Sequence, residues 1–194
     1  MGLVLSIENN QNVCDNMIDC LRRETDGAKV EPLQGSKEMA KKQTIYPAVE
    51  NPNAKAIVIY CIDLRYPIAF RLFVEKELGY KEGQVVHIEI AGGPAALAHP
   101  KDMKNRCRSM IRQILFSCEH FKSIERVILI GHQDCAYYSV VPRNGNGEKD
   151  REKKDLPIAV DLIGLIVPEK VVVQAYYAYF ADKKRTKIAF QQIV

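Results

Sequence analysis

Two short segments contain the side chains best suited to chemistry. The segment GHQDC places His132 and Cys135 three positions apart, directly after an apolar run. The segment CIDLR contains Cys61, Asp63 and Arg65 at the end of another apolar run. Imidazole nitrogen and thiolate sulfur are ligands that zinc prefers, and three such ligands with an open fourth position are typical of catalytic zinc sites. We therefore ask whether the fold brings the two segments together.

The apolar runs themselves predict the strands that would position these residues. Runs at 55–61, 84–93 and 126–130 are continuous and rich in β-branched residues, as expected for strands buried on both faces. Ligands bind at the carboxyl ends of strands in open α/β sheets, so side chains that follow these strands should converge. The run at 84–93 ends in a glycine pair, which would let backbone approach a small site closely.

The remaining pattern alternates helices with strands. We expect a helix over 66–80, with Pro67 in its first turn and Gly79 as its C-terminal cap, and a long helix over 99–121 with Cys107 and Cys118 on its buried face. A charged loop at 143–155, a short buried helix bracketed by Pro157 and Pro168, and strands at 170–180 and 187–194 around a basic, solvated turn at 182–187 complete the prediction. This order predicts a single α/β domain with a mainly parallel central sheet, flanking helices and an antiparallel C-terminal hairpin.

Length and composition suit one globular domain. The chain has 194 residues, of which 47% are hydrophobic. We expect residues 1–50 to form an N-terminal helical and loop extension, with Cys14 and Cys20 on a helix, and residues 51–194 to form the α/β domain that binds zinc. Gly2 followed by Ser6 matches the bare N-myristoylation pattern, which is short and often accidental.

Charge and hydropathy disfavour two classes of partner. Lysine and arginine exceed aspartate and glutamate by only 28 − 24 = 4, and no basic stripe with interleaved aromatics indicates nucleic-acid binding. No run reaches the roughly 18 apolar residues of a membrane helix. The N-terminus lacks a secretory signal and the six cysteines are dispersed, which predicts reduced thiols in a cytoplasmic protein.

Simpler interpretations of each motif residue stay open on the residues alone. Cys61 by itself is more often a buried core thiol, and Asp63 with Arg65 is more often a surface ion pair. His132 and Cys135, at i and i+3 of a first helical turn, are able to face one metal, although His-x-x-Cys is a weak motif by itself. Their joint placement after two predicted strands favours a metal site.

Together, CIDLR and GHQDC resemble the Cys-x-Asp-x-Arg and Gly-His-x-x-Cys motifs of the β-class carbonic anhydrases, over roughly residues 55–194. The resemblance implies Cys61, His132 and Cys135 as ligands of Zn²⁺, with Asp63 and Arg65 as a dyad beside the open coordination position. It also implies a β-carbonic-anhydrase-like fold and a homodimer or higher even oligomer. The N-terminal helix is expected to pack on a neighbouring subunit.

The same resemblance implies a reaction, the reversible hydration of carbon dioxide to bicarbonate by a zinc-bound hydroxide. Asp63 would accept the hydroxide's hydrogen bond, and Arg65 would keep Asp63 ionised and off the metal. Two alternatives are a catalytically silent zinc protein, with a fourth ligand such as Asp63, and a hydrolase of carbonyl sulfide or carbon disulfide. Glu89 and Ile90 stand where the family typically has arginine and asparagine, so an acidic residue replaces a basic one near the site.

Other polar residues near the motifs have less distinctive patterns. Asp134 is expected in an N-terminal helical turn, where it would favour the helix dipole. Tyr137 and Tyr138 either line the pocket or pack a short helix. We expect His87 in a strand near the site. The two remaining histidines are expected at surface or helix-end positions, namely His99 and His120.

Overall fold

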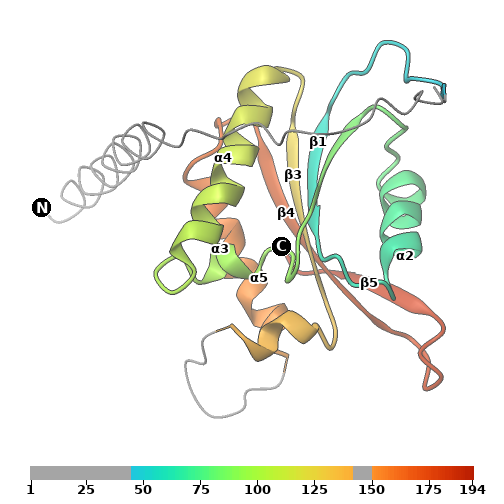
Figure 1. The fold of residues 1–194 in the computed structure, drawn as a ribbon, viewed down its shortest axis with the longest axis vertical. Coiled ribbons are helices and arrows are strands. Elements are labelled where there is room, and N and C mark those ends of the chain that lie inside the picture. Colours follow the sequence, from blue (N-terminus) through green and yellow to red (C-terminus); the bar gives the residue numbers. More distant parts are fainter. Residues whose placement is uncertain (1–44, 142–149) are drawn as a thin grey trace, which may run out of the picture. The chain divides into compact units, whose positions relative to one another are not determined.

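A five-stranded sheet forms the centre of the unit that comprises residues 47–194 (Figure 1). The structure is a computed structural model that describes residues 45–141 and 150–194. The strands are β1 Ala56–Tyr60, β2 Val85–Glu89, β3 Arg126–His132, β4 Val172–Phe180 and β5 Ile188–Gln192. Their order is β2-β1-β3-β4-β5, and only β5 runs antiparallel to its neighbour. The predicted mainly parallel sheet and antiparallel C-terminal hairpin are confirmed.

Helices cover both faces of this sheet (Figure 1). One face carries α3, α4 and α5, and the other carries α2 with the π-helix η1 that continues it. A 3-10 helix, η2, follows β3. The helices are α2 Pro67–Leu72, η1 Phe73–Glu77, α3 Ala95–Ala98, α4 Lys104–His120, η2 Ala136–Ser139 and α5 Arg151–Gly164.

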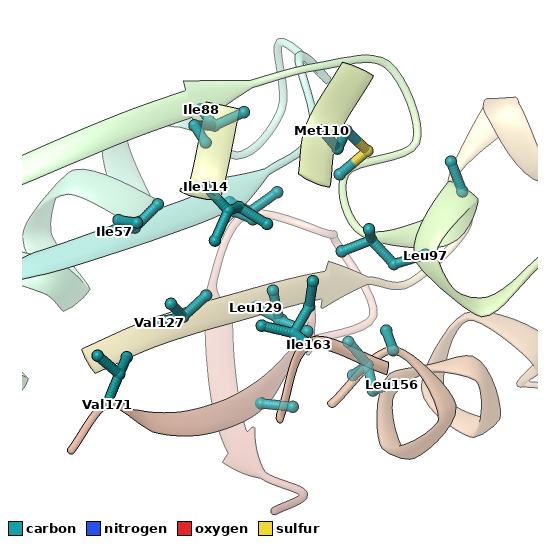
Figure 2. Close-up of a cluster of buried hydrophobic side chains, with 14 of the residues drawn as sticks. Ile57, Ile88, Leu97, Met110, Ile114, Val127, Leu129, Leu156, Ile163 and Val171 are labelled. Carbon is teal, nitrogen blue, oxygen red and sulfur yellow. The ribbon is translucent and has the colours of Figure 1, made fainter. Parts of the chain in front are cut away.

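Strand alternation divides the buried side chains into two cores. Ile57 and Leu129 point towards α4 and α5, where they meet Ile114 (Figure 2). Val58 and Ile128 belong to the opposite core, under α2. Both faces are apolar because successive strand residues point to opposite sides of a sheet that helices cover on both sides. The expected buried positions of Cys107 and Cys118 on the long helix are confirmed.

The first predicted helix has the expected ends. Pro67 opens α2, and Gly79 follows the π-helix with a φ of 75°, a conformation that glycine adopts without steric cost. The last turn is wider than an α-helix, since Leu78 N–H donates to Phe73 O over five residues. The following strand then begins close to its predicted position.

The third predicted helix begins at the wrong residue. We expected a loop through residue 155 and a helix after Pro157, but α5 begins at Arg151 and contains Pro157. A proline inside a helix removes one backbone hydrogen bond. Burial of Leu156 and Ile163 against the sheet holds the helix despite that loss. The short helix α3 was not predicted.

Several predictions concern residues that the structure does not describe. The helix with Cys14 and Cys20, and the pattern at Gly2, lie outside the described residues. Residues 47–194 form one compact unit, and the expected boundary near residue 50 stays a prediction. Within the described ranges, no helix has the length and apolar character needed to cross a bilayer.

Candidate metal centre

Three candidate ligands meet at the carboxyl end of the parallel strands. Cys61 follows the last residue of β1, and His132 is the last residue of β3, which pairs with β1. The ligand atoms of Cys61, His132 and Cys135 all lie within 4.8 Å of one another, and all three residues are buried. The Sγ atoms of Cys61 and Cys135 are 3.8 Å apart. The strand-end rule therefore located the convergence correctly.

The local structure of the second motif differs from the prediction. His132 and Cys135 do not share a helical turn, because His132 ends a strand and Cys135 precedes η2. A tight turn joins them, in which Asp134 has a φ of 55°. This turn, rather than helical spacing, brings the thiol back beside the imidazole.

The glycine pair after β2 lets backbone reach the first candidate ligand, Cys61. Gly92 N–H donates a hydrogen bond to Cys61 Sγ at 3.3 Å. A Cβ on Gly93 would lie 3.1 Å from the Cys61 backbone nitrogen and 3.3 Å from Ile130 O. Such contacts are tighter than ordinary packing, so glycine is needed for this close approach.

One nitrogen of the His132 imidazole is hydrogen bonded and the other faces the two thiols of the cluster. Its Nδ1 lies 3.0 Å from the carbonyl oxygen of Gln133, which requires the proton to be on Nδ1. The other nitrogen, Nε2, is buried and has no hydrogen-bond partner among the described residues. Buried polar atoms are normally satisfied, and a ligand histidine normally donates its second nitrogen to such a carbonyl. The donor set therefore fits a metal ion.

The hydrogen bond between the two thiols shifts their pKa values in opposite directions. Cys135 hydrogen bonds to Cys61 and, with His132 and Gly92, lowers the pKa of Cys61 to about 4. The hydrogen bond to Cys61, with burial and the charge of Cys61, raises the pKa of Cys135. A divalent cation would allow both thiols to ionise, because thiolates are the form that binds metal.

Asp63 and Arg65 form a bidentate pair beside the cluster. Arg65 Nε donates to Asp63 Oδ1 at 2.9 Å and Arg65 Nη2 donates to Asp63 Oδ2 at 2.7 Å. The backbone N–H of Arg65 also donates to Oδ1 at 3.0 Å. These hydrogen bonds lower the pKa of Asp63 to about 2. Asp63 is not a member of the three-residue cluster, and both of its oxygens face Arg65.

Two further hydrogen bonds lock the motifs together. Arg65 Nη2 donates to Asp134 O at 2.8 Å, and Tyr66 OH donates to Gln133 O at 2.9 Å. The Tyr66 ring lies 4.4 Å from the His132 ring, centroid to centroid. We did not predict Tyr66, because nothing in its sequence context distinguishes it from a residue that merely precedes a helix.

The other polar residues have varied positions. Asp134 does not support a helix dipole as expected, because it lies before η2 and its carboxylate pairs with Arg185 of the basic turn. Tyr137 packs on Gly92, and Tyr138 lies near the carboxylate of Asp155. Burial raises the pKa of Tyr138.

The histidines also have defined positions. His87 lies in β2 as predicted, with Nδ1 3.2 Å from Tyr60 OH. His87 and Glu89 line a cavity of about 710 Å³ that none of the three candidate ligands lines. His99 ends α3 and His120 ends α4, so both helix-end predictions are confirmed. The sequence did not predict that the side chain of His99 is buried.

Comparisons with known proteins give structural likeness only. No protein-family model matches the sequence, and no curated protein matches it significantly. The β-carbonic anhydrase isoform I of Trichomonas vaginalis matches with a TM-score of 0.50 and 11% sequence identity. The match covers 77% of this chain and 88% of the Trichomonas chain. The carbonic anhydrase of Glaciozyma antarctica matches with a TM-score of 0.45 and 18% sequence identity, over 75% of this chain and 85% of the Glaciozyma chain. The described domain therefore has the fold of the β-carbonic anhydrases.

Proposed function

We propose that the protein is a zinc enzyme that reversibly hydrates carbon dioxide to bicarbonate. The observation that carries this proposal is the buried Nε2 of His132, which has no hydrogen-bond partner in the described part of the chain and lies beside two thiols. An ionised carboxylate, held by Arg65, belongs to the same segment as Cys61. Two sulfur donors and one imidazole match a zinc site with one position left open.

Cys61, His132 and Cys135 would hold the metal. When bound, zinc supplies a water-derived nucleophile near neutral pH, because it lowers the pKa of water from 15.7 to about 7. The chain fixes the donor atoms before binding: Gln133 O holds the His132 tautomer and Gly92 N–H supports the Cys61 thiolate. Such outer hydrogen bonds orient ligands and limit the loss of freedom on binding.

Asp63 is suited to orient a reacting hydroxyl group. Its pKa of about 2 keeps the carboxylate ionised at any physiological pH. A carboxylate offers about four acceptor positions, and Arg65 occupies three of them. The remaining position is able to accept a hydrogen bond from the nucleophile and so direct its lone pair at the substrate carbon.

Arg65 has two roles in this proposal. Its two hydrogen bonds turn both Asp63 oxygens towards the guanidinium, which disfavours Asp63 as a fourth metal ligand and thus the silent alternative. Its Cζ lies 5.6 Å from the ring centroids of both Tyr66 and Phe180, so the cation is fixed in place. A fixed cation next to the site would also favour the anionic product over neutral carbon dioxide.

The test is a stopped-flow hydration assay with a pH indicator, on zinc-loaded wild type and on Cys61→Ser. We expect hydration well above the uncatalysed rate for the wild type and a loss of both zinc and activity for Cys61→Ser. Cys118→Ser changes a buried thiol of α4 outside the site and should keep both. Zinc-loaded wild type without hydration activity between about pH 7 and 9, a window around typical zinc-water pKa values, would refute the reaction.

A further inference from the structure

Arg106 extends from α4 to the backbone that surrounds the candidate metal centre. Its Nη1 donates to the hydroxyl of Tyr137 at 2.8 Å, and its Nη2 donates to Ala91 O at 3.0 Å. The guanidinium carbon lies 4.4 Å from the centroid of the Tyr137 ring. One half-buried cation therefore connects the segment after β2 with the segment after Cys135.

The contact with Ala91 leads directly to a ligand. The carbonyl of Ala91 and the N–H of Gly92 belong to the same peptide group, and that N–H donates to Cys61 Sγ at 3.3 Å. A cationic donor on the carbonyl side polarises the peptide and strengthens its N–H as a donor. Arg106 is thus linked to the Cys61 sulfur through a single peptide unit.

The contact with Tyr137 leads to both thiols. The Tyr137 ring lies so close to Gly92 that a Cβ there would overlap it, so the ring fixes the Gly92 peptide from the outer side. Tyr137 follows Cys135 by two residues, so the position of its ring also constrains the segment that carries the second thiol. By holding the Tyr137 hydroxyl and Ala91 O together, Arg106 fixes the backbone donor to Cys61 and the segment that carries Cys135.

We propose that Arg106 is a positioning residue that tunes the two-thiolate metal centre through the Ala91–Gly92 peptide and Tyr137. This inference rests on the proposed zinc function. Stronger N–H donation withdraws charge from a thiolate and holds the sulfur at a fixed place. Loss of an outer-shell partner typically lowers metal affinity by 10- to 100-fold.

Zinc affinity tests the consequence for the metal. Chelator competition would compare wild type with Arg106→Met, Arg106→Lys and the control Arg112→Met, whose side chain is exposed on the same helix. We expect about 10- to 100-fold weaker binding for Arg106→Met, partial recovery for Arg106→Lys, and no change for Arg112→Met. Lysine keeps the charge but lacks the planar fork that reaches two acceptors. Wild-type affinity in Arg106→Met would overturn the inference.

A second measurement needs no metal. Amide hydrogen exchange of Gly92 in the zinc-free protein should be at least about tenfold faster in Arg106→Met, because the peptide loses its carbonyl partner. The Ile90 amide, which donates to Tyr60 O at 3.0 Å, is the internal control and should not change. Unchanged Gly92 exchange would also overturn the inference. If wild type binds no zinc, the proposed function fails, while this exchange experiment still decides the role of Arg106.

Cobalt substitution distinguishes tuning from packing. The thiolate-to-cobalt charge-transfer band reports the charge on the sulfur atoms. It should shift in Arg106→Met and return towards the wild-type energy in Arg106→Lys. A residue that only filled space would leave the band unchanged in Arg106→Met, whose side chain is also long and flexible, and that result would contradict tuning.

Discussion

The Sγ atoms of Cys61 and Cys135 lie 3.8 Å apart, although 74 positions separate the two residues in the sequence. Cys61 comes after β1 and Cys135 comes after β3, and these strands are parallel neighbours. The hydrogen bond between these two buried thiols lowers the pKa of Cys61 and raises the pKa of Cys135, so ionisation of one thiol opposes ionisation of the other. The pair is therefore a site that a soft divalent metal would stabilise.

Replacing Cys135 should remove the metal without unfolding the protein. We expect Cys135→Ser to lower bound zinc from about one ion per chain to below about 0.1, because a neutral hydroxyl is a poor replacement for a thiolate. Metal analysis after dialysis against a weak chelator measures this. Cys107→Ser, in the core of α4, is the matched control and should retain zinc. Full zinc occupancy in Cys135→Ser would exclude this thiol as a ligand.

Asp63→Asn should separate metal binding from turnover. The amide cannot act as an ionised acceptor and also places a donor towards Arg65, so we expect zinc to stay bound while kcat/KM falls by about 100-fold or more. Steady-state hydration rates and metal content, measured on the same sample, check this. Equal kcat/KM for wild type and Asp63→Asn would contradict the role that we propose for the carboxylate.

Two glycines with similar backbone conformations allow a matched comparison. Gly79 has a φ of 75° and Gly92 a φ of 81°, but only Gly92 lies against a side chain, that of Tyr137. Gly79→Ala should lower the free energy of unfolding by about 1–2 kcal/mol, from backbone strain alone. Gly92→Ala should cost more and also weaken zinc binding, because the added methyl group displaces the Tyr137 ring. Chemical denaturation measures the free energy of unfolding of each variant, and zinc titration measures its metal affinity. Equal losses of unfolding free energy in Gly79→Ala and Gly92→Ala would refute the contact between Gly92 and the Tyr137 ring.

The buried pair of His99 and Asp155 should stabilise the packing of α3 on α5. His99 Nε2 lies 2.7 Å from Asp155 Oδ2, and both residues are buried. Asp155→Ala leaves the imidazole without its partner and should lower the free energy of unfolding by about 1–3 kcal/mol. Asp161→Ala, on the exposed side of the same helix, should change it by less than about 0.5 kcal/mol. Similar unfolding midpoints in both variants would show that the pair contributes little.

The sheet and the three candidate ligands were predictable because the relevant signals are local. Continuous apolar runs mark the strands, and the carboxyl ends of parallel strands are adjacent whatever the loops do. Cys61 and His132 therefore follow from their positions relative to two runs. The turn at Asp134 was not predictable from the residue pattern, since the spacing of His132 and Cys135 fits a helix equally well.

The surroundings of the site depend on tertiary contacts that have no local signal. Arg106 occupies a polar position of an amphipathic helix, where an exposed side chain is the ordinary expectation. Asp155 belongs to a charged run typical of a loop, yet its side chain faces His99, 56 positions away. The start of α5 was missed for the same reason. Its charged first turns are helical because the apolar residues that follow are buried against the sheet.

The most direct test of the central claim is X-ray absorption at the zinc edge of the purified, reduced protein. Two sulfur ligands at about 2.3 Å, one imidazole nitrogen at about 2.0–2.1 Å and one further light atom are predicted, from Cys61, Cys135, His132 and an open position. Loss of one sulfur in Cys61→Ser would assign that ligand. A folded protein that binds no zinc, or a zinc shell without two sulfur atoms, would contradict the account.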